Sequence, residues 1–268
     1  MASIAGWIYD KPLRGSYTFT HAEVVKAFPE MSASSIARAL TREVSKGRIM
    51  SPLRGFYVIV PDEYVLRGAV PQSFYLDDMM LHLGRKYYVA LLSAASYHGA
   101  SHQVPLRFNV MIEPPAMRDK KGEKYLTHYF CKSQIPEVYV ERRQTRTGYV
   151  NISCPELTAV DLLTYQAKTG SVSRAATVLA ELAEKLDFGR LGVDFVKEVP
   201  VTSLQRLGYI LDEVLEEYIA SDSLYSMLKC SGFALQYVPL KAGKSSEGCE
   251  KNAKWRIIVN ETIEIDEL

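Results

Sequence analysis

A capping box near the start of the chain constrains the fold more than any other feature, because it begins a helix at a defined residue. Thr20 is followed three residues later by Glu23, so the threonine hydroxyl can accept from the Glu23 amide while the glutamate reaches back. The helix expected over residues 21–28 ends before Pro29, since the residue before a proline disfavours helical backbone angles. Ser32 is then a second N-cap. This stretch predicts a helix, a short turn and the start of another helix.

The second helix is expected over residues 33–46 and ends at Gly47, which suits the C′ position. Apolar residues of the two helices are expected to be buried, those of the second helix as one stripe: Val24, Val25 and Phe28, then Ile36, Ala37, Leu40 and Val44. The face opposite that stripe carries hydroxyl and basic side chains and no acid: Ser35, Arg38, Arg42 and Ser45, flanked by Thr41 and Lys46. Arginine can hold guanine through two hydrogen bonds, and serine or threonine can hold phosphate or base edges, so this face predicts contact with DNA.

A hairpin follows the second helix. Its strands are expected over residues 48–50 and 56–60, and the connecting loop contains Pro52 and Gly55, which suit a turn. Arg48 begins the first strand, and Arg54 sits in the loop, where a hairpin can reach the minor groove or the backbone of DNA. Two helices, a short turn and a hairpin with a basic tip are typical of a winged helix-turn-helix. We therefore expect a DNA-binding domain over residues 1–62, the alternative being a winged helix that binds another protein.

Charge and composition support this interpretation and exclude others. The 268 residues carry a formal net charge of +1, yet residues 1–60 hold eight Lys or Arg against four Asp or Glu, so the front end is basic. No apolar run of about 18 residues predicts a membrane span, and the N-terminus lacks the pattern of a secretory signal. The four cysteines are far apart, which fits a reducing cytoplasm and a cytoplasmic location.

The remaining residues, 63–268, predict a larger mixed α/β domain. Helices are expected first, then strands, then helices again, and two extended segments at the end: helices over 74–83 and 86–98, strands over 107–112, 125–130, 138–141 and 149–152, helices from Pro155, from a cap at Ser173 and over 203–219, and extended segments over 235–240 and 255–259. The fold class is therefore α+β, with an N-terminal winged helix-turn-helix followed by a mixed α/β C-terminal domain.

Candidate catalytic residues are scarce. The chain has no glycine-rich phosphate loop, no G-x-S-x-G and no H-E-x-x-H. His98 and His102 could hold a metal if one helix carried both, but Gly99 interrupts that turn, so a histidine pair forming hydrogen bonds at a helix end is the favoured interpretation. We expect no catalytic residue, no metal and no cofactor, and hence no enzyme.

Two further groups of residues allow more than one interpretation. Five tyrosines fall on expected strands, where sheet packing is favoured over a binding site: Tyr125, Tyr129, Tyr139, Tyr149 and Tyr237. Basic residues outnumber acids between residues 118 and 146: Arg118, Lys120, Lys121, Lys124, Lys132, Arg142, Arg143 and Arg146. These residues form either a solvated loop and sheet edge or a second nucleic-acid contact, which would make binding steeply dependent on salt.

Three stretches resemble the AbiEi family of antitoxins from bacterial type IV toxin–antitoxin systems. The first is SASSIARALTREVSKGRIMSPLRGFYVIVP at 32–61 and the second is YYVALLSAASYHGASHQ at 87–103. The third runs from CPELTAVDLLTY (154–165) through ATVLAELAEKLD (176–187) and SLQRLGYILD (203–212) to WRIIVN (255–260). The first stretch is generic among regulators, whereas the other two are far more specific.

The resemblance implies a function for each part of the chain. An N-terminal winged helix binds inverted repeats in the promoter of its own operon and represses it, and the C-terminal domain carries antitoxicity and assists cooperative DNA binding. The implied partner is a nucleotidyltransferase-like toxin, AbiEii, which need not form a stable complex with the antitoxin. The family is associated with abortive phage resistance. A transcriptional regulator whose C-terminal domain senses a ligand is the alternative, and an enzyme acting on the toxin or its substrate is disfavoured, because the chain shows no phosphate cradle.

Overall fold

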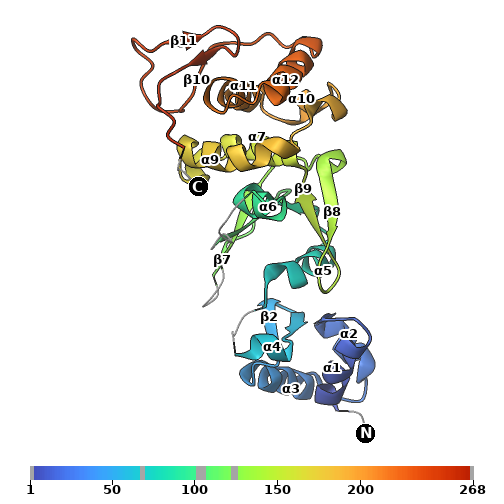
Figure 1. Ribbon diagram of the computed structural model, residues 1–268. Coiled ribbons are helices and arrows are strands. Elements are labelled where there is room, and N and C mark those ends of the chain that lie inside the picture. Colours follow the sequence, from blue (N-terminus) through green and yellow to red (C-terminus); the bar gives the residue numbers. More distant parts are fainter. Residues whose placement is uncertain (1–2, 67–69, 101–106, 122–125, 266–268) are drawn as a thin grey trace. The chain divides into compact units, whose positions relative to one another are not determined.

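A computed structural model describes residues 3–66, 70–100, 107–121 and 126–265 (Figure 1). The chain divides into two compact units, and neither of them is continuous in sequence. The first comprises Met1–Tyr88, Leu106–Ile135 and Arg142–Ile152, and the second comprises Val89–Pro105, Pro136–Glu141 and Ser153–Leu268. Helices and sheets are mixed throughout the described residues, so the predicted α+β class is confirmed.

The N-terminal part of the first unit alternates helices with the strands of a small antiparallel sheet. Its elements are α1 (Ile4–Leu13), β1 (Thr18–Thr20), α2 (His21–Ala27), α3 (Ala33–Ser45), β2 (Ile49–Leu53) and β3 (Phe56–Ile59), and the strand order is β1-β3-β2. The capping box at α2 is present, with the Glu23 amide donating to Thr20 Oγ1 at 3.2 Å and the Thr20 amide donating to Glu23 Oε2 at 2.9 Å. Ser32 caps α3 as predicted. Helix α1 and strand β1 were not predicted, although Ser3 caps α1 by accepting a hydrogen bond from the Gly6 amide.

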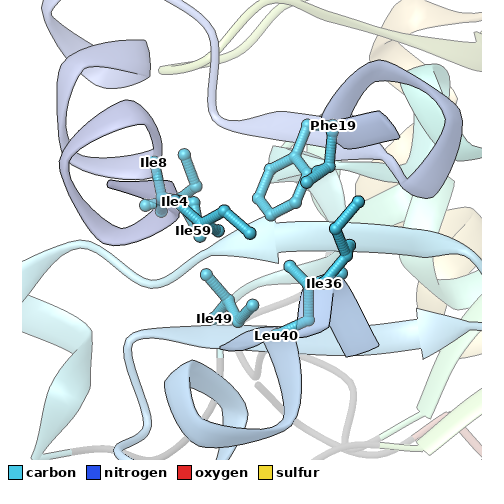
Figure 2. Close-up of a cluster of buried hydrophobic side chains, with 8 residues drawn as sticks. Ile4, Ile8, Phe19, Ile36, Leu40, Ile49 and Ile59 are labelled. Carbon is cyan, nitrogen blue, oxygen red and sulfur yellow. The ribbon is translucent and has the colours of Figure 1, made fainter. Parts of the chain in front are cut away.

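A single apolar cluster holds these elements together (Figure 2). Every one of them contributes to it: Ile4, Ile8, Phe19, Val24, Ile36, Leu40, Ile49 and Ile59. Burying each such side chain stabilises the fold by about 1.5–3 kcal/mol. Trp7 of α1 packs edge-on against Phe19 at a ring distance of 5.4 Å, which closes the cluster on the α1 side. Because α1, α2 and all three strands pack on the same cluster, α3 is held at a fixed angle.

Shorter elements continue the first unit beyond residue 61. They are α4 (Asp62–Val65), the 3₁₀ turn η1 (Gln72–Phe74) and α5 (Leu76–His82). Leu76, Met79 and Met80 of α5 are buried as predicted. The Thr18 hydroxyl donates to Asp78 Oδ2 at 2.6 Å, and Arg146 forms an ion pair with Glu63. The Thr18–Asp78 hydrogen bond and the contact between the Phe56 and His82 rings at 5.6 Å thus join residues on either side of position 62.

A six-stranded mixed sheet follows. Its strands are β4 (Tyr87–Val89), β5 (Arg107–Ile112), β6 (Lys120–Lys121), β7 (Leu126–Cys131), β8 (Val140–Gln144) and β9 (Tyr149–Ser153), in the order β6-β7-β5-β4-β9-β8. A 3₁₀ turn, η2 (Glu137–Tyr139), precedes β8. Strands β5 and β7 are parallel, and β6 and β7 are antiparallel.

The helix predicted over 86–98 is wrong in its first turn. Residues Tyr87, Tyr88 and Val89 form the buried strand β4, and the helix α6 (Leu91–Tyr97) begins only after it. The reason is position in the sheet, because β4 lies between β5 and β9 and a strand covered on both faces reads as a continuous apolar run. Gly99 ends α6 with a φ of +77°, as its place in the sequence predicts.

The second unit is mainly helical. After α6 come α7 (Pro155–Thr164), α8 (Gln166–Thr169), α9 (Val172–Leu182), η3 (Ala183–Lys185), η4 (Phe188–Arg190), α10 (Phe195–Glu198), α11 (Val201–Tyr209), the π-helix η5 (Ile210–Val214) and α12 (Tyr218–Cys230). Pro155 starts α7 as predicted, and α7 is buried from Pro155 to Leu163. The cap of α9 is Ser171 rather than Ser173, because the Arg174 amide donates to Ser171 Oγ. In the described part of the chain, no helix is long and apolar enough to cross a membrane.

The predicted helix over 203–219 is interrupted at the π-helix, and Trp255 accounts for the break. The indole is fully buried against Gly208, and its Nε1 donates to Asp212 Oδ2 at 2.8 Å. A small sheet of β10 (Val238–Pro239), β12 (Ile257–Ile258) and β11 (Lys251–Asn252) follows α12 in the chain (Figure 1). Trp255, just before β12, contacts Gly208 of α11 and lies 5.3 Å from the Tyr225 ring of α12. The extended segments expected over 235–240 and 255–259 therefore pair with each other, with a third strand between them in sequence.

Candidate nucleic-acid interface

Helix α3 buries a different stripe from the predicted one. Ile36 and Leu40 are 1% exposed as expected, but Ala37 is exposed and Val44 is 40% exposed. Glu43 takes the inward position instead and is 4% exposed. The spacing of Ile36, Leu40 and Glu43 is the ordinary i, i+4, i+7 pattern of a buried helix face, and this is the signal that would have found the glutamate.

Two basic side chains satisfy the buried Glu43 carboxylate. Lys46 Nζ lies 3.4 Å from Glu43 Oε1, and Arg48 Nη1 lies 3.3 Å from Glu43 Oε2. A buried charge needs such partners, because removing it from water without them is costly. Lys46 and Arg48, both predicted to bind DNA, are therefore already engaged within the fold, although their side chains remain partly exposed.

Because Glu43 is buried where Val44 was expected, the exposed face of α3 is rotated about the helix axis relative to the predicted face. The rotation is about half of the ~100° that separates consecutive residues of a helix. The open face is now centred on Arg38 and Ser45, with Thr41 beside them, and all three are exposed. Arg42 is exposed on one flank, and Ser35 is half-buried beyond it. Because Glu43 points inward, the open face still carries no acid.

The hydroxyl groups of this face already donate hydrogen bonds within the helix. The Thr41 hydroxyl donates to the carbonyl oxygen of Ala37 at 2.9 Å, and that of Ser45 donates to Arg42 at 2.8 Å. The Ser35 hydroxyl lies 2.9 Å from that of Ser32. These groups must rotate before they can donate to a phosphate, so the arginines are the donors that are ready to bind.

Arg38 and Arg42 line a groove beside the start of α1. The groove has a volume of about 480 Å³, and its lining is shared between α1, the turn before α3 and α3 itself: Ser3, Ile4, Ala5, Met31, Ser35, Arg38, Ala39, Arg42 and Glu43. Among the residues that the structure describes, neither arginine forms an ion pair. The structure thus brings Ser35, Arg38 and Arg42 together as an uncompensated positive site.

The predicted hairpin is present, but its turn is shorter than expected. Strand β2 runs on to Leu53, so the turn consists of Arg54 and Gly55, and Gly55 has a φ of +79°. A register shift between Met50 and Leu53 accommodates Pro52 inside the strand. Arg54 is exposed at the tip, and within the described chain it has no acidic partner. The amide of His21 donates to the carbonyl of Gly55 at 2.8 Å, which ties the tip to the start of α2.

The histidines do not form a metal site among the described residues. His98 is buried and its Nε2 lies 2.7 Å from the carbonyl oxygen of Ser153, whereas His102 lies outside the described residues. Within the described ranges, no three His, Cys, Asp or Glu residues are placed to hold a metal. Of the five tyrosines, Tyr139 is buried, and Tyr125 is not described.

The basic residues between 118 and 146 fall at opposite edges of the six-stranded sheet. Lys120 lies on the edge strand β6, and Arg142 and Arg143 lie on the edge strand β8. Arg142 stacks on Tyr149 at 4.3 Å, and Arg146 pairs with Glu63. Lys124 lies outside the described residues. The described members of this group therefore do not form one continuous basic patch.

Comparisons with known proteins find a likeness to a protein family and to a solved structure. Residues 88–213 match the family model described as the AbiEi antitoxin C-terminal domain. A comparison with curated proteins finds no match. The crystal structure of the RV2827C protein from Mycobacterium tuberculosis has a TM-score of 0.65 to this chain and 16% sequence identity, and the match covers 94% of this chain and 89% of that one. At this identity the likeness shows the fold alone.

The family match agrees with the resemblance found in the stretches at 87–103 and 154–212. It supports an antitoxin role in general, and the AbiEi antitoxins are not a family of enzymes. Residues 88–213 are therefore similar to the AbiEi antitoxin C-terminal domain, and the predicted resemblance to the AbiEi-family antitoxins is confirmed.

Proposed function

We propose that this protein is the antitoxin of a type IV toxin–antitoxin system and that it represses its own operon. Residues 1–62 act as a winged helix-turn-helix that binds inverted repeats in the promoter, and residues 63–268 form the C-terminal antitoxin domain. The partner is a nucleotidyltransferase-like toxin, which the antitoxin counteracts in the cytoplasm without a need for a stable complex. Through this pair the protein contributes to abortive phage resistance.

The open face of α3 carries the DNA-binding part of this proposal. Arg38 and Arg42 lie one turn apart without an acidic partner among the described residues, and the helix's acid is turned inward. In a winged helix-turn-helix, the second helix of the motif enters the major groove, where arginine is the commonest reader of guanine. Ser35, Thr41 and Ser45 then contact phosphate or base edges, Lys46 and Arg48 add positive charge behind the helix, and Arg54 contacts the backbone from the hairpin.

A gel-shift titration with the protein's own promoter fragment tests the proposal. Arg38→Ala with Arg42→Ala removes both donors, and at about 1–3 kcal/mol for each arginine contact the loss of affinity is at least tenfold. Lys168→Ala with Arg174→Ala removes the same charge from exposed positions on α8 and α9 and serves as the matched control. Equal affinity of the two double variants would exclude α3 as the reading helix.

Antitoxicity is tested in the same variants. When the full-length Arg38→Ala, Arg42→Ala protein is co-expressed with the adjacent toxin gene, growth is restored if neutralisation does not depend on DNA binding. Point variants are preferable to a cut after residue 62, because the cut would separate Thr18 from Asp78, which are joined by a hydrogen bond inside the first unit.

A second candidate function is a regulator whose C-terminal domain senses a ligand. The observation in its favour is a groove of about 600 Å³ in the second unit, whose lining mixes charged, polar and apolar residues such as Glu213, Lys244 and Val259. Its volume lies in the range of small-molecule sites, although such sites are usually more apolar. A regulator of this kind would not rescue growth from the toxin, so the co-expression experiment separates the two candidates.

A further inference from the structure

Two cations and a tyrosine gather on the small sheet of the second unit. Tyr237 precedes β10, Lys251 lies in β11 and Arg256 precedes β12. The Arg256 guanidinium carbon lies 5.0 Å from the centre of the Tyr237 ring, and Lys251 Nζ lies 5.4 Å from it. Arg256 Nη1 also donates to the Tyr237 hydroxyl at 3.1 Å. We refer to these three exposed side chains as the basic–aromatic cluster.

A buried amide fixes the position of this cluster. Strands β10 and β12 are parallel with Val238 opposite Ile257, so Tyr237 and Arg256 occupy matching places just before the two strands. The Gln205 side chain, 1% exposed on α11, donates to the carbonyl oxygens of Gln236 at 2.8 Å and of Trp255 at 2.9 Å. One amide thus holds the residue before Tyr237 and the residue before Arg256 together.

Arg256 has a backbone conformation that an arginine adopts at a cost. Its φ is +54°, in the left-handed region that glycine and asparagine tolerate best. If position 256 served only to form the turn, glycine or asparagine would suit it better than arginine. Strained backbone of this kind is concentrated at binding and catalytic sites, where it aims a side chain that the site needs.

The charges of the cluster are not neutralised. In the described ranges neither Lys251 nor Arg256 has an acidic partner, whereas Lys254 between them pairs with Asp212 at 2.9 Å and with Asp222 at 3.0 Å.

Two acids close to the cluster elements in sequence act on other groups. Burial raises the pKa of Tyr209 on α11, and the charges of Glu213 and Glu250 raise it further. Glu213 also accepts a hydrogen bond from Asn252 at 2.7 Å. The basic–aromatic cluster therefore presents net positive charge to solvent.

We propose that the basic–aromatic cluster binds a single-stranded nucleic acid, with a base stacked on Tyr237 and phosphates held by Lys251 and Arg256. Aromatic rings flanked by lysine and arginine are the common means of holding unpaired strands, because every base offers a flat face and every phosphate a charge. Tyr237 is 39% exposed, so a base can reach its ring when one of the two cations turns from the ring to a phosphate. The cluster lies beyond residue 213, outside the family match, and it is separate from the duplex site proposed on α3.

The test uses the full-length protein carrying Arg38→Ala and Arg42→Ala, so that α3 does not contribute. Fluorescence anisotropy is measured with labelled strands of about 10 nucleotides, oligouridine and oligothymidine, and with a blunt duplex as competitor. We expect binding of at least one strand, weakening as salt is raised, and poor competition by the duplex. The two strands distinguish RNA from DNA as the natural ligand. Absence of binding to both strands, or equal competition by the duplex, would overturn the proposal.

Variants of the cluster separate binding from folding. Tyr237→Ala is expected to weaken binding at least about fivefold, whereas Tyr237→Phe keeps the stacking surface and stays within about twofold of the parent. Arg256→Gly removes a cation and relieves the backbone, so affinity falls at least about fivefold while the melting temperature is unchanged or higher. Glu216→Gly is the matched control, because Glu216 has a φ of +56° and lies outside the cluster. Unchanged affinity in Arg256→Gly, or an equal loss in Tyr237→Phe and Tyr237→Ala, would show that the cluster only stabilises the sheet.

Discussion

The indole of Trp255 lies flat against Gly208, so close that a Cβ at position 208 would overlap the ring. This pair joins α11 to the small C-terminal sheet across 46 intervening residues. Trp255 is also anchored from its other side, since its Nε1 donates to Asp212 in the π-helix. The segment after residue 209 is therefore shaped around one side chain that is distant in sequence.

Gly208→Ala should destabilise the second unit more than an ordinary helical substitution. A single methyl forces the indole to move in a well-packed core, which typically costs about 1–3 kcal/mol or more. Chemical unfolding followed by tryptophan fluorescence would measure it. Gly6→Ala is the control, because that helical glycine meets only the flexible Ser3 hydroxyl, and there alanine should be neutral or slightly stabilising. Similar midpoints for the two variants would contradict the packing described.

Glu43→Leu should leave the fold stable and strengthen non-specific DNA binding. Replacing a buried charge with an apolar group of similar volume is often neutral or stabilising, and it frees Lys46 and Arg48 to meet phosphates. Glu43→Ala, in contrast, leaves a cavity and should cost about 1–3 kcal/mol. Titrations at several salt concentrations provide the check, because freed cations steepen the dependence of affinity on salt. A loss of DNA affinity in a folded Glu43→Leu variant would contradict the orientation of α3.

Cys154 should resist alkylation in the native protein. Burial, helped by the nearby Glu156 carboxylate, raises the pKa of the Cys154 thiol to about 12, so the reactive thiolate is scarce near neutral pH. Exposed Cys131 and Cys230 serve as internal controls. Iodoacetamide labelling at pH 8 followed by peptide mass mapping should modify those two within minutes to hours and Cys154 only after unfolding.

The raised pKa of Cys154 should also make the fold less stable at high pH. In the folded protein the Cys154 thiol keeps its proton up to about pH 12, whereas in the unfolded chain it loses the proton near pH 9. Its contribution to the free energy of unfolding is therefore complete below pH 9 and is lost between pH 9 and 12. Cys154→Ala should therefore flatten the fall in stability across that window.

Asp212 should make the fold sensitive to acid. Burial alone would raise the pKa of Asp212, but the hydrogen bonds from Trp255 and Lys254 outweigh it and lower the pKa below its usual value. Because the pKa of Asp212 is lower in the folded state, ionised Asp212 stabilises the fold at every pH above its pKa in the unfolded chain. This stabilisation is lost as the pH falls through the pKa of Asp212 in the folded state. Asp212→Asn removes this titration, so its midpoint of unfolding should depend less on pH below about 4. An unchanged acid limb in that variant would exclude Asp212 as a source of acid sensitivity.

Local signals in the sequence predicted much of the first unit. The capping box at Thr20, the cap at Ser32 and the positive φ at Gly47 are decided by neighbouring residues, and the helix–turn–helix spacing follows from them. Arg38, Thr41, Arg42, Ser45 and Arg54 are exposed as a DNA-binding surface requires.

Features that depend on distant partners were not predictable in the same way. Glu43 is buried only because Arg48 and Lys46 reach it, and β4 is a strand only because β5 and β9 flank it. The break after α11 requires Trp255, and the cluster at Tyr237 requires the pairing of β10 with β12. Such contacts join residues that are far apart in the sequence, and the periodicity of apolar residues within one helix or strand does not predict them. Whether the boundary between the two functional domains lies at residue 62 stays a prediction.

The discontinuous course of the first unit has a consequence for biosynthesis. Its last piece, Arg142–Ile152, supplies most of β9, which stands next to β4 in the sheet. At about 5–20 residues per second, a ribosome needs roughly 3 to 13 s to pass from β4 to the end of β9. Until then the nascent chain holds an unfinished sheet with an open edge at β4. The first unit therefore cannot complete its fold until Arg142–Ile152 has been synthesised, long after its first stretch, Met1–Tyr88.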